Sequence, residues 1–197
     1  MKNLFFISLA FITLFFSCQK PEKYPNEPQI DYQKIVISEI IDTLGTEVVS
    51  YDLIFNALDG DSNLGLKQTD VTGIFSPDSF YHNNAFVTLY KKVDGEFVEG
   101  ITYTDNQGIV HTDTLTYSQR IPYTDPVGLN DYFKAEIKIN MQIEKIGLSN
   151  FFYDLDTIKF VFFVVDKDLN KSNIQETQEI IRGFRGTLID TDTVIIY

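Results

Sequence analysis

The sequence predicts an all-β protein built as an antiparallel β-sandwich, with a jelly roll as the alternative arrangement. Polar and apolar residues alternate with a period of two, most clearly over residues 133–143, as expected for a strand with one buried face. Many such short segments are separated by Gly, Asn and Asp turns, which is typical of sandwiches. No segment has the apolar period of an amphipathic helix.

The first 17 residues predict a cleaved export signal. Lys2 precedes an apolar run over residues 4–16, which is shorter than the roughly 20 residues that a membrane-spanning helix needs. A basic start, a short apolar stretch and a small residue are the pattern of a signal peptide. Ser17 is the small residue, and Cys18 follows it directly.

Residues 15–18, Phe-Phe-Ser-Cys, resemble the lipobox of bacterial lipoproteins, although that family prefers Leu where this chain has Phe15. The resemblance implies that the Cys18 thiol receives a diacylglyceryl group and that the signal is cut before it. It also implies that the new amino group of Cys18 is acylated. Two or three acyl chains are enough for stable membrane attachment. We therefore expect an exported lipoprotein of the cell envelope, anchored in the outer membrane.

Residues 18–33 are expected to form a lipidated tether. Pro21, Pro25 and Pro28 lie in this polar segment, and an extended Pro-rich chain reaches about 3.1 Å per residue, or roughly 45 Å in all. Such a tether lifts a domain clear of the headgroups. Residues 19–22 also resemble the surface-export signals of some Gram-negative lipoproteins, which implies display on the cell surface. The folded domain is predicted to occupy residues 34–197.

From residue 34 onward, the alternating pattern predicts about nine strands. Residues 158–165 are apolar almost throughout, which favours a central strand covered on both faces. Asp94-Gly95 and residues 105–108 have the composition of hairpin turns. The predicted strands are 34–41, 48–58, 85–93, 96–104, 109–118, 133–143, 158–165, 173–181 and 187–197.

Residues 164–173 resemble the last hairpin of bacterial immunoglobulin-like and fibronectin type III-like modules, which often read Asp, two or three residues, Asn and then Ser-Asn. Asp166, Asn170, Ser172 and Asn173 carry this resemblance. It implies that the sandwich is immunoglobulin-like.

A candidate calcium loop follows the second predicted strand. Asp59, Asp61 and Asn63 place oxygen side chains at alternate positions, and calcium binds six to eight oxygens at about 2.3–2.6 Å. The spacing matches the start of an EF-hand loop, but Leu64 occupies the position of its glycine, and flanking helices are not predicted. The segment instead resembles an Asp-Gly-Asp loop of uncharacterised surface lipoproteins. The alternative is a turn in which Asp and Asn side chains bond their own backbone.

A second acidic loop repeats this spacing with Asp166, Asp168 and Asn170. In the immunoglobulin arrangement, the loop after the second strand and the loop before the last strand lie at the same end. The two acidic loops could then face each other. An even number of strands between them would instead place them at opposite ends, and an ordinary hairpin turn is the alternative for this loop.

Charge and cysteine content exclude several kinds of partner and site. The mature chain has 15 basic and 28 acidic residues, a balance that repels phosphate backbones and attracts divalent cations. We therefore expect no nucleic-acid partner. Because Cys18 is the only cysteine, the chain has no internal disulfide and no thiolate metal cluster.

Sequence motifs do not indicate an enzyme. There is no Gly-x-Ser-x-Gly, His-Glu-x-x-His or phosphate-loop motif, and His82 and His111 are expected to be surface residues. Several tyrosines could contact a sugar but are more typical of strand packing: Tyr81, Tyr90, Tyr103, Tyr117 and Tyr123.

We therefore expect a non-catalytic binding or accessory module that contacts a protein or glycan outside the cell. A structural subunit of an outer-membrane or envelope complex is the alternative, and a hydrolase is the least favoured interpretation.

Overall fold

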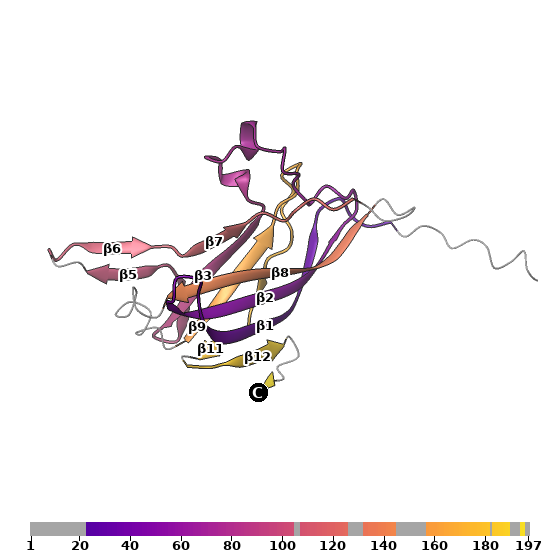
Figure 1. Ribbon diagram of the computed structural model, residues 1–197. Coiled ribbons are helices and arrows are strands. Elements are labelled where there is room, and N and C mark those ends of the chain that lie inside the picture. The colour runs from indigo at the N-terminus through magenta and orange to yellow at the C-terminus, as the bar shows by residue number, and fades with distance from the viewer. Residues whose placement is uncertain are drawn as a thin grey trace, which may run out of the picture.

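A computed structural model describes residues 23–104, 107–125, 132–144, 157–181, 183–189 and 194–195. Two antiparallel sheets pack face to face, and the core lies between them (Figure 1). The predicted export signal and Cys18 lie outside the described residues.

The first sheet has five strands and the second has six. The first contains, in spatial order, β13 (Val194–Ile195), β12 (Gly186–Ile189), β1 (Gln29–Ile41), β2 (Glu47–Asp59) and β8 (Phe133–Glu144). The second contains β10 (Gln175–Glu176), β9 (Thr157–Val164), β3 (Ala85–Val93) and β4 (Glu96–Glu99), with β11 (Ile180–Ile181) on β9 and β7 (Thr116–Gln119) on β3. A separate hairpin of β5 (Ile101–Thr104) and β6 (Val110–Asp113) projects away from both sheets in Figure 1.

The predicted fold class, an antiparallel β-sandwich, is confirmed. β1, β2 and β8 are neighbours in one sheet, and β10, β9 and β3 are neighbours in the other. This is the A-B-E and G-F-C arrangement of immunoglobulin-like sandwiches. The strand order therefore favours the immunoglobulin-like arrangement over the jelly roll.

Alternating burial along the strands builds the core. On β9, every second side chain from Ile158 to Val164 is buried, and the Phe162 ring lies 5.2 Å from that of Phe55 on β2. Burying a large apolar side chain contributes about 1.5–3 kcal/mol to folding. The other face of β9 is half-buried, so the prediction that this strand is covered on both faces was wrong.

The first strand begins earlier than residue 34, where the folded domain was predicted to start. β1 starts at Gln29, and Ile30 and Tyr32 are buried in the core. A register shift between Tyr32 and Lys34 marks a bulge in the pairing with β2. A bulge changes which face alternate side chains point to, so the period-two pattern of β1 does not continue back through residue 33.

Several predicted strands are shorter or divided. Residues 96–104, predicted as one strand, form two: β4 ends at Glu99 and β5 begins at Ile101. Gly100 lies between them with a φ of +79°, a conformation that favours glycine. The segment predicted as 109–118 forms β6 and β7, and the segment 173–181 forms only the short β10 and β11.

A long excursion, residues 67–84, connects β2 to β3 beyond the first loop. It contains two 3₁₀ turns, η2 (Gly73–Phe75) and η3 (Phe80–His82), and it projects from the top of the sandwich in Figure 1. The described part of the chain contains no helix long and apolar enough to cross a bilayer.

Candidate metal centre

The two acidic loops predicted from the sequence meet at one end of the sandwich. Loop 59–66 follows β2, and loop 165–173 follows β9. Asn63 of the first loop donates a 3.0 Å hydrogen bond from Nδ2 to Asp168 Oδ2 of the second, 105 residues away. The Lys167 backbone N–H also donates to the Asn63 carbonyl at 3.3 Å. Of the two arrangements left open by the sequence, the structure therefore has the one in which the loops share an end.

Three carboxylates converge between these loops. One oxygen from each of Asp59, Asp61 and Asp166 lies within 4.8 Å of the others. Oxygens on opposite sides of a calcium ion are separated by about 5 Å, because each lies about 2.3–2.6 Å from the metal. The group contains only oxygen ligands, a set that suits hard cations such as calcium, magnesium or manganese. This cluster could hold a metal ion.

Asp59 is the buried centre of the cluster. Its side chain is 0% exposed, and its Oδ2 accepts a 2.8 Å hydrogen bond from the Leu64 backbone N–H. Its Oδ1 is buried without a hydrogen-bond partner among the described residues. Burial, then the negative charge of Asp61 and a hydrogen bond between the two carboxyl groups, raise the pKa of Asp59 from 3.8 to about 6, against the opposing effect of the Leu64 and Asn63 backbone N–H groups. A cation beside Oδ1 would satisfy this oxygen and offset the charge repulsion.

Asp166 is held in place by Asn170. The Asn170 backbone N–H and Nδ2 donate to the two Asp166 oxygens, each at 2.8 Å. Asp166 is 1% exposed, and burial raises its pKa. Each carboxylate oxygen has a second lone pair, so both can still bind a cation. Asn170, one of the predicted ligands, therefore orients Asp166 in this structure.

Asn63 connects Asp61 of the cluster to Asp168 of the second loop. Its Nδ2 donates to Asp61 Oδ2 at 3.1 Å and to Asp168 Oδ2 at 3.0 Å, while its Oδ1 is buried without a partner among the described residues. Rotating this amide by 180° would turn an oxygen toward the carboxylates, where a cation would favour it. Asp61 and Asp168 remain exposed to solvent.

The predicted turn alternative accounts for only part of this geometry. The Asn170 N–H bond to Asp166 and the Leu64 N–H bond to Asp59 close the two loops, as Asx side chains do in turns. Neither bond explains why a second buried carboxylate lies beside Asp59 or why Asp59 Oδ1 has no donor. A cation between the carboxylates is one group that would satisfy Asp59 Oδ1.

Asn84, which the sequence analysis did not single out, supports the first loop. Its side chain is 2% exposed; Nδ2 donates to the Leu64 carbonyl, and Oδ1 accepts from the Ile121 N–H at 2.7 Å. Its backbone carbonyl accepts from the Val165 N–H at 2.8 Å. Asn84 thus connects both loops to the segment after β7. The sequence contained no signal that separated Asn84 from its neighbour Asn83.

Other predicted site residues lie elsewhere. The His82 ring Nδ1 lies 3.1 Å from the Phe75 carbonyl within the excursion, and the His111 side chain is outside the described residues. Tyr117 packs beside Phe160, and its burial raises its pKa to about 12. Two lysines lie over the Tyr123 ring, Lys67 at 4.6 Å and Lys167 at 5.5 Å.

Searches for known relatives found no matching family model, no similar curated protein and no similar solved structure.

Proposed function

We propose that this protein is an exported lipoprotein whose β-sandwich serves as a non-catalytic binding module, and that calcium joins its two acidic loops. The observation that carries the calcium assignment is the buried, unpaired Asp59 Oδ1 in a group of three carboxylates. Asp166 comes from the other loop, so a bound cation would hold the two loops in one arrangement. Loops at the end of a sandwich commonly form binding surfaces on such scaffolds.

The geometry favours this role for Asp59 over a catalytic one. A carboxyl with a pKa near 6 is typical of a general acid, and this could favour the hydrolase alternative. Asp59 is nevertheless 0% exposed, which argues against direct contact between its carboxyl and a substrate. A cation is a small enough ligand to be reached by a buried carboxylate.

Calcium is expected to raise the melting temperature of the full mature chain. Exported calcium modules bind with dissociation constants of about 10⁻⁴–10⁻³ M, so roughly 1 mM calcium stabilises the fold by about 0.4–1.4 kcal/mol. That corresponds to a rise of a few degrees for a domain of this size. Thermal melts in chelator and in calcium measure the rise. Asp61→Ala should abolish it, because the variant removes a charged ligand.

Asp168→Ala should reduce the calcium response less than Asp61→Ala does, since Asp168 contacts the cluster through Asn63. Asp78→Ala is the matched control, because Asp78 is an exposed aspartate of the excursion. Magnesium should stabilise the protein less than calcium, because it requires a tighter octahedral shell. Equal melting curves in chelator and in several millimolar calcium would reject the site.

Lipidation of Cys18 is expected to be detectable in cells. Growth with an alkyne-bearing fatty acid should label the wild type, and Cys18→Ala should lose the label because the acceptor thiol is missing. Ser17→Ala is a suitable control, since alanine is also a small residue at that position. Equal labelling of the Cys18→Ala variant would overturn the anchor.

A further inference from the structure

The start of the described chain is fixed to the end of the sandwich that carries the acidic loops. The Gly60 N–H donates to the Pro25 carbonyl at 2.9 Å, and a Cβ on Gly60 would lie only 2.4 Å from that oxygen. The Tyr24 ring also packs edge-on against Tyr132, with ring centroids 4.8 Å apart. The chain is therefore part of the fold from Tyr24 onward, where the sequence analysis expected a free tether.

This attachment shortens the tether. Only residues 19–23 separate Cys18 from Tyr24, and a fully extended chain gains at most about 3.3–3.6 Å per residue. The reach is thus roughly 20 Å, less than half of the predicted 45 Å. A strand as long as β1, with 13 residues, spans about 40 Å. The turn at residues 42–46 therefore lies at the far end of β1, about 40 Å along the strand from its first residue.

Apolar side chains are exposed on the excursion at this same end. Val71, Ile74 and Phe80 are 42%, 49% and 64% exposed. Exposed apolar residues also occur at the far turn, where Leu44 is 87% exposed, so exposure alone does not select an end. The position of the tether distinguishes the two ends of the sandwich.

Polar and aromatic contacts attach the excursion to the end of the sandwich that carries the acidic loops. The Arg120 guanidinium donates to the carbonyls of His82, Lys67 and Asp70, each at 2.7 Å, and Lys167 Nζ pairs with Asp70 Oδ2 at 2.7 Å. The Phe80 ring stacks on Phe86 at a centroid distance of 4.5 Å.

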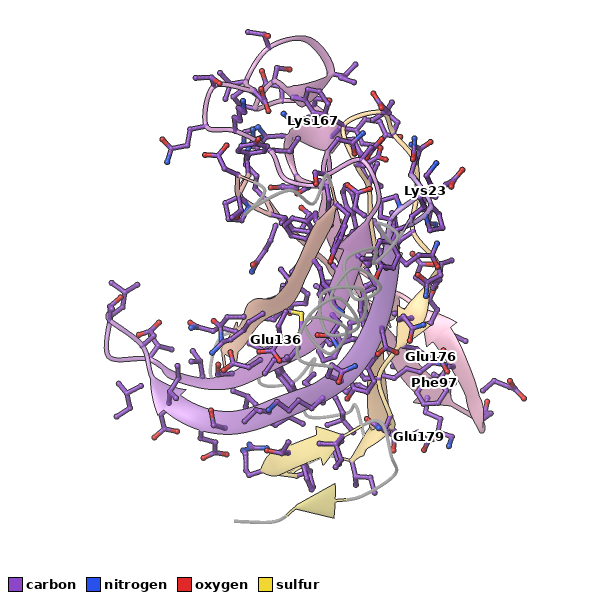
Figure 2. All side chains as sticks on the ribbon, turned by 90° about the vertical axis from the view of Figure 1, so that its right-hand side faces the viewer. Lys23, Phe97, Glu136, Lys167, Glu176 and Glu179 are labelled. Carbon is purple, nitrogen blue, oxygen red and sulfur yellow. The ribbon has the colours of Figure 1, made fainter. Side chains whose placement is uncertain are left out.

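Figure 2 shows Lys167 and Lys23 toward the upper end of the molecule, and Phe97 and Glu179 toward the lower end.

Leu169 adds an exposed apolar side chain at a strained position. Its φ is +67°, and its side chain is 40% exposed at the turn beside the carboxylate cluster. This backbone conformation favours glycine or asparagine and is unfavourable for leucine. The local fold therefore does not explain the leucine, whereas an external apolar contact would use its side chain.

From these observations, we infer that this end of the sandwich sits on the lipid bilayer, with Val71, Ile74, Phe80 and Leu169 inserted among the headgroups. The inference rests on the proposed lipid anchor at Cys18. A tether of about 20 Å keeps this end beside the headgroup layer, which is roughly 5–8 Å thick on each side of the bilayer. Apolar side chains held there gain by leaving water, as they do in other interfacial anchors.

Single tryptophans can test the orientation, because the chain contains no tryptophan. The lipidated full mature chain is reconstituted in phosphatidylcholine vesicles with brominated acyl chains, in the presence of calcium. Ile74→Trp and Phe80→Trp should show blue-shifted emission and be quenched several times more strongly than Leu44→Trp. Two reporters are used because Phe80→Trp could disturb the stack on Phe86. Circular dichroism melts verify that each variant is folded.

A second variant separates membrane contact from folding. Leu169→Asn relaxes the left-handed backbone, so the protein should be at least as stable as the wild type. In the Ile74→Trp background, the same substitution should weaken quenching by bromine, because one inserted side chain is lost. If quenching in the Ile74→Trp background were unchanged, Leu169 would not contact the bilayer and would be removed from the inferred membrane-facing surface.

The outcomes distinguish this inference from the proposed function. Mass spectrometry of the purified chain first shows whether Cys18 carries lipid, and an unmodified cysteine would overturn both. If lipid is present but residues 74 and 80 are not quenched, the anchor stands and the membrane-facing end is rejected. The exposed side chains would then be assigned to a protein partner. Equal quenching of Leu44→Trp would also reject the orientation, because the far turn would then contact lipid.

Discussion

Asp59→Asn is expected to stabilise the calcium-free protein at pH 7 and to abolish its response to calcium. In the wild type, a fully buried carboxylate faces two other carboxylates, and its Oδ1 has no donor among the described residues. An asparagine can still accept from the Leu64 N–H, and its amide can donate to Asp61 or Asp166. The substitution removes a buried charge while it keeps the shape of the side chain.

The gain in stability should depend on pH in a defined direction. The folded pKa of Asp59, about 6, lies above its usual value of 3.8, so the folded state binds this proton more tightly than the unfolded state. The stabilisation from that proton is complete below about pH 4 and is lost as the pH rises through 6. The variant and the wild type should therefore melt together near pH 4, and the variant should melt higher at pH 7.

The size of the gain follows from the same shift. A difference of about two pKa units corresponds to about 3 kcal/mol, and solvent screening of the exposed Asp61 charge reduces this to roughly 2 kcal/mol. We expect a melting temperature about 4–8 °C higher than that of the wild type in chelator. Because calcium raises the melting temperature of the wild type only, the difference between the two proteins should narrow as calcium is added.

Asp78→Asn, which neutralises an exposed aspartate of the excursion, is the control and should change the melting temperature little at any pH. If Asp59→Asn instead lowered the stability of the calcium-free protein at pH 7, Asp59 would have a partner that satisfies its charge. The argument for a cation would then fail.

Asn84→Ala is expected to lower both the stability of the domain and its affinity for calcium. The variant leaves the Leu64 carbonyl and the Ile121 N–H buried without their partner. Each unsatisfied buried group costs about 1–3 kcal/mol, so we expect a loss of roughly 2–5 kcal/mol and a fall in melting temperature of about 5–15 °C. The loss of a group that orients metal ligands typically weakens metal binding 10- to 100-fold.

The neighbouring asparagine provides a matched control. Asn83 makes one exposed side-chain bond, from Nδ2 to Ser118 Oγ at 3.1 Å, so Asn83→Ala should change stability by about 0.5 kcal/mol or less. Titration of calcium against the melting temperature of both variants measures the effects on stability and on affinity together. Equal behaviour of the two variants would show that the Asn84 hydrogen bonds do not organise the loop.

The sequence by itself determined the fold class, and its spacing marked the three carboxylates that the structure brings together, Asp59, Asp61 and Asp166. Period-two burial follows from the pleat of a strand, so β2, β3 and β8 were predicted nearly as they occur, and the apolar run that marked β9 located that strand to within one residue at each end. The Asp-x-Asp-x-Asn spacing marked both acidic loops because local spacing requires no knowledge of the fold. The start of β1 was missed because the bulge after Tyr32 interrupts the alternation.

Only the tertiary structure decided what these local features do together. Whether the acidic loops share an end depends on how strands from distant parts of the chain pair, and a pattern within one loop contains no information about that pairing. The burial of Asp59, the support by Asn84 and the attachment of Pro25 to Gly60 are likewise contacts between distant segments. The charge environment of Asp59 depends on which carboxylates these contacts bring beside it. The length of the tether depends on where the start of the chain is attached to the domain.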